Sequence, residues 1–283
     1  MRIVYVNGHF VPEDEAKISV FDRGFLFADA IYEVTSVADG KMIDFEAHMA
    51  RLKRSMRELD FEISFDNDEL RSLHQEIIDQ NDLAEGVIYL QVTRGAADRD
   101  FNFSEMTGSA SVVLFSQVKK LVENPSAKIG ASVQLVEDKR WLRADIKTVQ
   151  LLYSSLVKTR AIKAGFDDVW MHRDGLITEG SSSNVYIVND QSEIITHQLN
   201  DTVLHGITRR AVLAVAESLQ MKVIERAFSI EELLSAKEAF ATSASGFVNP
   251  VVNVENHAIG GGAPGPVSTA LRNEYMRTSM KMV

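Results

Sequence analysis

Lys147 and Glu179 have the residue types and the spacing to act together on an aldehyde cofactor. Lys147 ends the segment Arg143-Ala-Asp-Ile-Lys147, and thirty-two residues later (179 − 147) Glu179 lies in Thr178-Glu-Gly-Ser-Ser-Ser-Asn184. A lysine amine can bind an aldehyde as a Schiff base, and a buried carboxylate can keep a pyridine nitrogen protonated, as pyridoxal chemistry requires. Each residue alone has a structural alternative, because most lysines are solvated and an acidic residue before a Gly-Ser turn is usually structural.

A candidate anion site lies where a glycine leads into an expected helix. Gly206-Ile207-Thr208 precedes a helix expected over Thr208–Leu219, so backbone N–H groups and a hydroxyl would lie at the positive end of a helix dipole. Such a site could bind a phosphate. The alternative is that Thr208 only caps the helix. The segment Thr242–Gly246 adds small hydrogen-bond donors after an expected strand.

Hairpins and amphipathic helices are expected in the first half of the chain. Asn7-Gly8 and Asp39-Gly40 lie between β-rich runs and predict tight turns. Apolar residues at spacings of three or four predict helices over His48–Leu59 and after Asn67. Strands are expected over Val87–Thr93 and Ala110–Val118.

The second half reads as strands separated by helices, with hairpin turns at Asp174-Gly175 and Asn189-Asp190. Strands are expected over Lys128–Glu137, Val169–His172, Val185–Val188, Lys222–Ala227 and Glu238–Thr242. Helices are expected near Ser154–Ala164, Thr208–Leu219 and Val267–Met280. Charge and proline in residues 119–126 predict an inter-domain linker. We therefore predict an α+β fold with one domain over residues 1–118 and a second over residues 127–283.

Composition and charge exclude several classes of function. The net charge of −10 argues against a nucleic-acid or anionic-membrane surface, because either would need a basic patch. No apolar run approaches the roughly 18 residues that span a bilayer, and the amino terminus enters an expected strand, so we expect a cytoplasmic protein. The chain has no cysteine, and its seven histidines lack metal-binding spacing, so no dedicated metal site is expected.

Five segments, in this order and spacing, resemble the fold-type IV pyridoxal phosphate enzymes, and within that group the D-amino acid transaminases. Besides the segments around Lys147 and Glu179, they are Asp22–Glu33, Thr93–Gly95 and His205–Arg209. The resemblance implies a smaller N-terminal α/β domain and a larger C-terminal pseudo-barrel domain that binds the cofactor, assembled as a homodimer. It also implies pyridoxal 5′-phosphate as cofactor, with an amino donor and a 2-oxo acid as substrates.

The resemblance implies roles for individual residues in cofactor binding. Lys147 would form the Schiff base and move a proton between substrate and cofactor in a ping-pong transamination, while Glu179 would bind the pyridine nitrogen. Arg51, three residues after His48, would bind the phosphate, and Leu204 would pack on the cofactor face. Further cofactor contacts are expected from Ser183, Asn184, Ile207, Thr208, Ser243 and Ala244.

Substrate choice is expected to depend on how the donor carboxylate is bound. In the resembling D-enzymes, a tyrosine, an arginine and a histidine two residues beyond that arginine bind this carboxylate. The present chain offers Tyr32 and Arg99, but Phe101 replaces the histidine. Val34 is a further expected substrate contact, and Glu33 is expected near the lysine and the substrate.

Several activities remain open after this comparison. The leading expectation is transamination between a D-amino acid such as D-alanine and 2-oxoglutarate. The alternatives are a branched-chain L-amino acid transaminase and an (R)-selective amine transaminase, which an apolar Phe101 would suit. A lyase of the aminodeoxychorismate type usually carries Arg-Gly-Tyr where this chain has Arg99-Asp-Phe101, and a catalytically inactive ligand-binding protein would lack Lys147 or Glu179.

Overall fold

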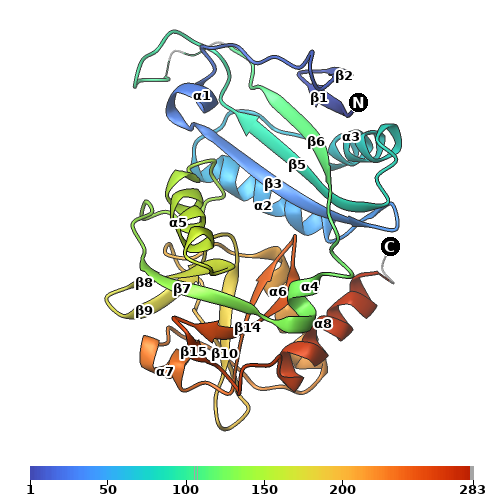
Figure 1. Ribbon diagram of the computed structural model, residues 1–283. Coiled ribbons are helices and arrows are strands. Elements are labelled where there is room, and N and C mark those ends of the chain that lie inside the picture. The colour runs from blue at the N-terminus through green and yellow to red at the C-terminus, as the bar shows by residue number, and fades with distance from the viewer. Residues whose placement is uncertain (105, 107, 281–283) are drawn as a thin grey trace. The chain divides into compact units, whose positions relative to one another are not determined.

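The chain folds into two compact units (Figure 1) in a computed structural model that describes residues 1–104, 106 and 108–280. Unit 1 comprises Met1–Lys120 together with Ile146–Gln150. Unit 2 comprises Leu121–Asp145 and, from Leu151, the rest of the described chain. The short segment that carries Lys147 therefore packs with unit 1, although the chain on both sides of it belongs to unit 2. The predicted domain assignment stays a prediction, and its last residues, 281–283, lie outside the described part.

Unit 1 is built on an antiparallel sheet with the strand order β2-β1-β6-β5-β3-β4 (Figure 1). Its strands are β1 (Ile3–Val6), β2 (His9–Pro12), β3 (Ala30–Ala38), β4 (Lys41–Met42), β5 (Glu85–Thr93) and β6 (Val112–Val118). Both predicted hairpins are confirmed, since Val6 pairs with His9 and Ala38 pairs with Lys41. The turn residues Asn7 and Asp39 have positive φ angles, which such two-residue turns require.

Two amphipathic helices pack on the sheet of unit 1 and confirm the predicted helices. They are α2 (Phe45–Glu58) and α3 (Asn67–Gln80), and their apolar side chains share one core with β3, β5 and β6. The five-residue helix α1 (Arg23–Phe27) was not predicted, because it is too short to show an apolar period. The Asp22 side chain caps α1 by accepting a hydrogen bond from the Gly24 N–H.

Unit 2 contains a sheet with the strand order β12-β11-β10-β13-β14-β7-β8-β9, with β15 paired to β14. The strands are β7 (Ala131–Glu137), β8 (Asp168–Arg173), β9 (Leu176–Gly180), β10 (Asn184–Val188), β11 (Ile194–Thr196), β12 (Val223–Glu225), β13 (Glu238–Ser243), β14 (Phe247–Val254) and β15 (His257–Ala258). The helices are α4 (Pro125–Ile129), α5 (Leu152–Lys163), α6 (Ile207–Ser218), α7 (Ile230–Leu234) and α8 (Pro266–Ser279).

This sheet must curl, because β9 and β10 lie five places apart in the strand order but are joined by residues 181–183 alone. A flat sheet would separate the two strands by about 24 Å. Three connecting residues span at most about 14 Å. The curl agrees with the expected pseudo-barrel, and the predicted α+β class is confirmed.

Several predicted boundaries in unit 2 were wrong. The strand expected from Lys128 begins only at Ala131, because Pro125–Ile129 forms helix α4 with Asn124 as its side-chain cap. Asparagine followed by proline is a helix-start signal, and it lies inside the segment that we predicted to be a linker. The strand expected over residues 222–227 is limited to β12.

None of the helices in the described part of the chain has the length and apolar character to cross a membrane. The described residues also contain no group of three or more His, Asp or Glu side chains arranged to hold a metal ion.

Arg272 of α8 ties together two segments of unit 2 that are distant in sequence. Its guanidinium donates hydrogen bonds to the carbonyl oxygens of Gly246 (2.7 Å), just before β14, and of Val248 (3.0 Å), within β14. It also donates to the carbonyl oxygens of Leu121 (2.7 Å) and Val122 (3.1 Å). Because Arg272 is buried, its guanidinium depends on these carbonyl groups for its hydrogen bonds.

Replacing Arg272 with methionine should lower the free energy of unfolding by about 2–4 kcal/mol, because it removes four hydrogen bonds made by one buried guanidinium. The matched control is Arg277→Met on the same helix, where the exposed guanidinium pairs with Glu274. That change should cost less than about 1 kcal/mol. Urea denaturation of both variants measures the difference, and equal costs would show that the four carbonyl contacts contribute no specific stability.

Candidate active site

Lys147 lies in a short extended segment that pairs with strand β3 in unit 1. The Tyr32 N–H donates to the Lys147 carbonyl (3.0 Å), and the Val149 N–H donates to the Ala30 carbonyl (3.1 Å). The Lys147 N–H also donates to Ser55 Oγ of α2 (3.4 Å). These contacts place the Lys147 Nζ atom 4.1 Å from the centroid of the Tyr32 ring. The structure therefore brings two of the predicted site residues together.

Tyr32 and Val34 share one face of β3, as alternation along a strand requires. Both are half-buried, and the Tyr32 ring stacks on Tyr89 of β5 with ring centroids 5.4 Å apart. Tyr89 in turn stacks on Phe115 of β6 at 4.8 Å. The amine of Lys147 thus lies against an aromatic face, which can hold a cation by its ring quadrupole and offers apolar contact to a ligand.

Glu33 points to the opposite face of β3, where it binds residues of α2 rather than Lys147. Its two carboxylate oxygens accept hydrogen bonds from Arg51 Nε (2.8 Å) and Nη2 (2.7 Å), and Oε2 lies 2.8 Å from His48 Nδ1. Burial alone would raise the pKa of Glu33, but the Arg51 charge and the hydrogen bonds outweigh it and lower the pKa to about 2. This bidentate pair fixes the orientation of the Arg51 guanidinium. The phosphate-binding role of Arg51 stays a prediction.

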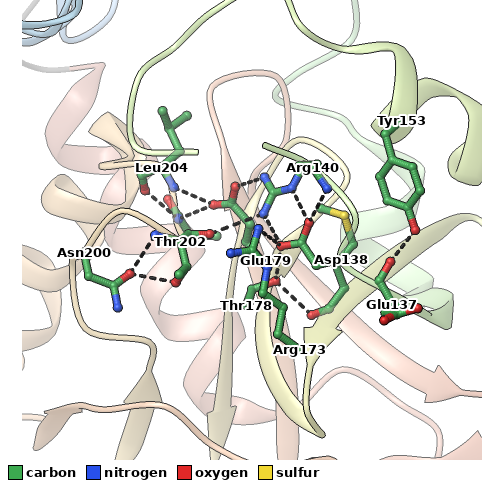
Figure 2. A network of polar contacts seen from close by, with 12 residues as sticks. Glu137, Asp138, Arg140, Tyr153, Arg173, Thr178, Glu179, Asn200, Thr202 and Leu204 are labelled. Atoms are coloured by element: carbon green, nitrogen blue, oxygen red, sulfur yellow. Dashed lines mark hydrogen bonds and ion pairs between the residues drawn. The ribbon is translucent and has the colours of Figure 1, made fainter. Parts of the chain in front are cut away.

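Glu179 is buried in unit 2 at the end of β9, within a network of polar contacts (Figure 2). Its Oε2 atom accepts hydrogen bonds from the Leu204 N–H (2.9 Å) and from Asn184 Nδ2 (3.2 Å). Its Oε1 atom forms an ion pair with Arg140 Nη1. A buried carboxylate needs such partners, so the orientation of Glu179 is fixed by three different segments of the chain.

Arg140 is a residue of this network that we did not predict from the sequence (Figure 2). It connects Glu179 to Asp138, which accepts hydrogen bonds from Arg140 Nε (2.9 Å) and Nη2 (2.7 Å) and from Thr178 Oγ1 (3.0 Å). Burial would lower the pKa of Arg140, but the two carboxylates raise it above its usual value. Burial would likewise raise the pKa of Asp138, but Arg140 and Arg173 lower it. These shifts favour the charged forms of Arg140 and Asp138.

The expected anion site at the start of α6 has its helix cap at Gly206, so the alternative that Thr208 is the N-cap is wrong. Ile207 and Thr208 are the first two helical residues, and their N–H groups have no partner within the helix. A Cβ atom added at Gly206 would lie 2.0 Å from Asn184 Oδ1. A side chain at this position would displace Asn184, so glycine allows the close packing of Asn184 against the start of α6.

Asn184 lies close to the other residues of unit 2 that were predicted to bind the cofactor. Its Nδ2 atom donates to the Leu204 carbonyl (2.9 Å), and its backbone lies opposite Thr242 in the pairing of β10 with β13. Ser243 and Ala244 follow directly after Thr242 and are half-buried, and α6 packs against β13. Ser183 closes the tight turn before β10, where its carbonyl accepts a hydrogen bond from the Gly180 N–H (2.8 Å).

Arg99 and Phe101 are exposed in a loop of unit 1, and Phe101 is 78% exposed. The Arg99 guanidinium lies 5.3 Å from the centroid of the Phe27 ring and 5.6 Å from that of the Phe101 ring. Among the contacts that the structure describes, Arg99 is not joined to Tyr32. Their shared role in carboxylate binding therefore stays a prediction.

Comparisons with known proteins show which family the chain resembles over its length. The chain matches the amino-transferase class IV family over residues 30–254. It is 38% identical to a D-alanine aminotransferase of Bacillus licheniformis, with 100% of both chains covered. It is 35% identical to a D-alanine aminotransferase of Staphylococcus haemolyticus, with 98% of this chain and 99% of that protein covered.

Solved structures of other aminotransferases have a similar fold. A branched-chain amino acid aminotransferase of T.th., solved with pyridoxamine 5′-phosphate, has a TM-score of 0.90 at 25% identity and covers 100% of this chain and 95% of its own. The branched-chain amino acid aminotransferase of Escherichia coli has a TM-score of 0.89 at 23% identity, covering 98% and 94%, and shows the fold alone.

Proposed function

The chain belongs to the class IV aminotransferase family, and we propose that it is a pyridoxal 5′-phosphate-dependent transaminase acting on D-amino acids. It would move the amino group of a donor such as D-alanine to a 2-oxo acid such as 2-oxoglutarate by a ping-pong mechanism. The observation that carries the choice of donor is the 38% identity over the full length to a D-alanine aminotransferase.

The residues present fit this cofactor. Lys147 offers an amine for the aldehyde, and Glu179 offers a buried, oriented carboxylate for the pyridine nitrogen. The start of α6 offers backbone N–H groups for the phosphate, at a glycine where a Cβ atom would not fit. When bound, pyridoxal phosphate supplies an electron sink for the charge that develops at the substrate Cα.

The chain's own residues would then hold the reactants and move protons. Lys147 Nζ, held against the Tyr32 ring, would act as the base that takes the proton from the substrate Cα and later gives it back as the acid. Glu179 would stabilise the protonated pyridine nitrogen, and its contacts to Arg140 and to the Leu204 N–H fix the orientation of its carboxylate. Glu33 keeps Arg51 in place for the phosphate.

Parallel assays with D-alanine and L-leucine, each with 2-oxoglutarate as acceptor, test this function. We expect turnover of D-alanine and little of L-leucine. The reverse preference would favour the branched-chain L-amino acid transaminase, the alternative whose support is the fold shared with the solved structures. No transfer from either donor would contradict the proposal.

We also propose that the protein is a cytoplasmic homodimer. The family membership supports this assignment. The exposed Arg99 and Phe101 would then lie where a second subunit could complete their surroundings. Light scattering after size exclusion should give twice the chain mass of 31.5 kDa, and a monomer would contradict it.

Phe101→His should raise the ratio of kcat/KM for D-alanine to that for (R)-1-phenylethylamine by roughly tenfold or more, because it adds a hydrogen-bond donor for the carboxylate. Phe101 itself should favour apolar donors, including amines without a carboxylate. The matched control is Phe25→His, since Phe25 is 75% exposed in the same unit. An unchanged or reversed ratio for Phe101→His would show that this side chain does not face the substrate.

A further inference from the structure

Asp29 joins two arginines of unit 1 through a single carboxylate oxygen. Its Oδ2 atom accepts hydrogen bonds from Arg23 Nε (2.8 Å) and from Arg94 Nε (2.8 Å). The three side chains are nearly buried, with 13%, 6% and 11% of their surface exposed. Asp29 therefore holds together two cations that would otherwise repel each other.

Both arginines also contact the loop that carries Arg99 and Phe101. Arg23 Nη1 donates to the carbonyl oxygen of Asp100 (2.6 Å), the residue between them. The Phe103 ring lies near both guanidinium groups, with its centroid 4.0 Å from Arg94 Cζ and 5.4 Å from Arg23 Cζ. The loop is thus held at two points, one on each side of Phe101.

The other ends of the same arginines rest on rigid parts of unit 1. Arg94 donates to the carbonyl oxygens of Leu59 (2.6 Å) and Asp60 (3.0 Å), directly after α2. Arg23 is the first residue of α1, and its N–H donates to the Gly95 carbonyl (2.8 Å). The loop is therefore connected to α1, to the end of α2 and to the segment that leads into β3.

We propose that Arg23 and Arg94, held by Asp29, are positioning residues that fix the loop Asp98–Phe103 and thereby set how tightly the donor carboxylate is bound. The proposal rests on the proposed function, in which Arg99 binds this carboxylate. An arginine that binds a carboxylate must present two N–H groups in a fixed orientation. A displacement of about 1 Å can weaken such an interaction by one to two orders of magnitude.

Arg23→Met tests this role, because methionine retains the apolar stem and removes the donor to Asp100. The matched control is Arg2→Met, since Arg2 also binds a carbonyl (Ser116), a carboxylate (Glu13) and a ring (Phe115) in unit 1. Three quantities are measured for each holoenzyme: KM and kcat for D-alanine, the dissociation constant of pyridoxal phosphate from its visible absorbance, and hydrogen exchange in a peptide covering residues 98–104.

For Arg23→Met we expect KM for D-alanine to rise roughly tenfold or more, with kcat changed less than about threefold. Cofactor affinity should stay the same, and exchange in the loop should increase. Arg2→Met should leave all three quantities unchanged, and Arg23→Lys, which retains one donor, should recover part of the loss. If Arg23→Met does not fold, the same three quantities are compared between Arg23→Lys and Arg2→Met.

Unchanged loop exchange in Arg23→Met would overturn the positioning role. A rise in KM with equally large falls in kcat and in cofactor affinity would also overturn it, because such a result indicates general damage. These outcomes differ from a failure of the proposed function. In that case the wild-type protein would not use D-alanine at all, while the exchange measurement would still show whether Arg23 holds the loop.

Discussion

Lys147→Ala should abolish the visible absorbance that the wild-type protein gains with pyridoxal phosphate, and should lower kcat by roughly four orders of magnitude or more. The effect is this large because one amine both binds the aldehyde and moves the proton. The structure places this amine 4.1 Å from the centre of the Tyr32 ring, and backbone pairing with β3 fixes its segment. Removing the side chain therefore removes the reactive group and leaves those backbone contacts in place.

The matched control is Lys139→Ala, since Lys139 is an exposed lysine that pairs with Glu137. This variant should retain the absorbance and the turnover of the wild type. Near-wild-type turnover in Lys147→Ala would show that another lysine carries the chemistry.

Glu179→Gln should lower kcat by roughly a hundredfold or more while cofactor uptake continues. Glutamine can still accept the hydrogen bond from the Leu204 N–H, but it has no charge to keep a pyridine nitrogen protonated. Arg140 would keep its ion pair with Asp138, so the fold around the site should be retained. Kinetics and absorbance of the variant measure the two effects separately.

The control for this change is Glu137→Gln, because Glu137 is a neighbouring glutamate with an exposed side chain. It should behave as the wild type does. If Glu179→Gln showed unchanged kinetics, the partner of the pyridine nitrogen would be another residue.

The elements that the sequence predicts well are those with local signals. The turns at Asn7-Gly8 and Asp39-Gly40 and the amphipathic helices α2 and α3 were all confirmed. The short helices α1 and α4 were missed, because five residues show no apolar period and their signals are caps alone. Because α4 was missed, the predicted start of the next strand at Lys128 was wrong.

Contacts between distant residues explain what was missed in the site. Arg140 lies 39 residues before Glu179, and nothing local distinguishes it from a solvated arginine. The sequence could have suggested that such a partner exists, because a buried Glu179 requires a cationic or hydrogen-bond-donating partner. Glu33 was expected beside the lysine with Tyr32, but adjacent residues of a strand point to opposite faces. It binds Arg51 and His48 instead.

The most direct test of the proposed function is the first half-reaction with D-alanine alone. The holoenzyme is mixed with excess D-alanine without any 2-oxo acid, and the pyruvate formed is compared with the amount of chain. We predict one pyruvate per chain, together with loss of the visible absorbance as the cofactor becomes aminated, and no such change with L-leucine. Unchanged absorbance and no pyruvate from D-alanine would contradict the account.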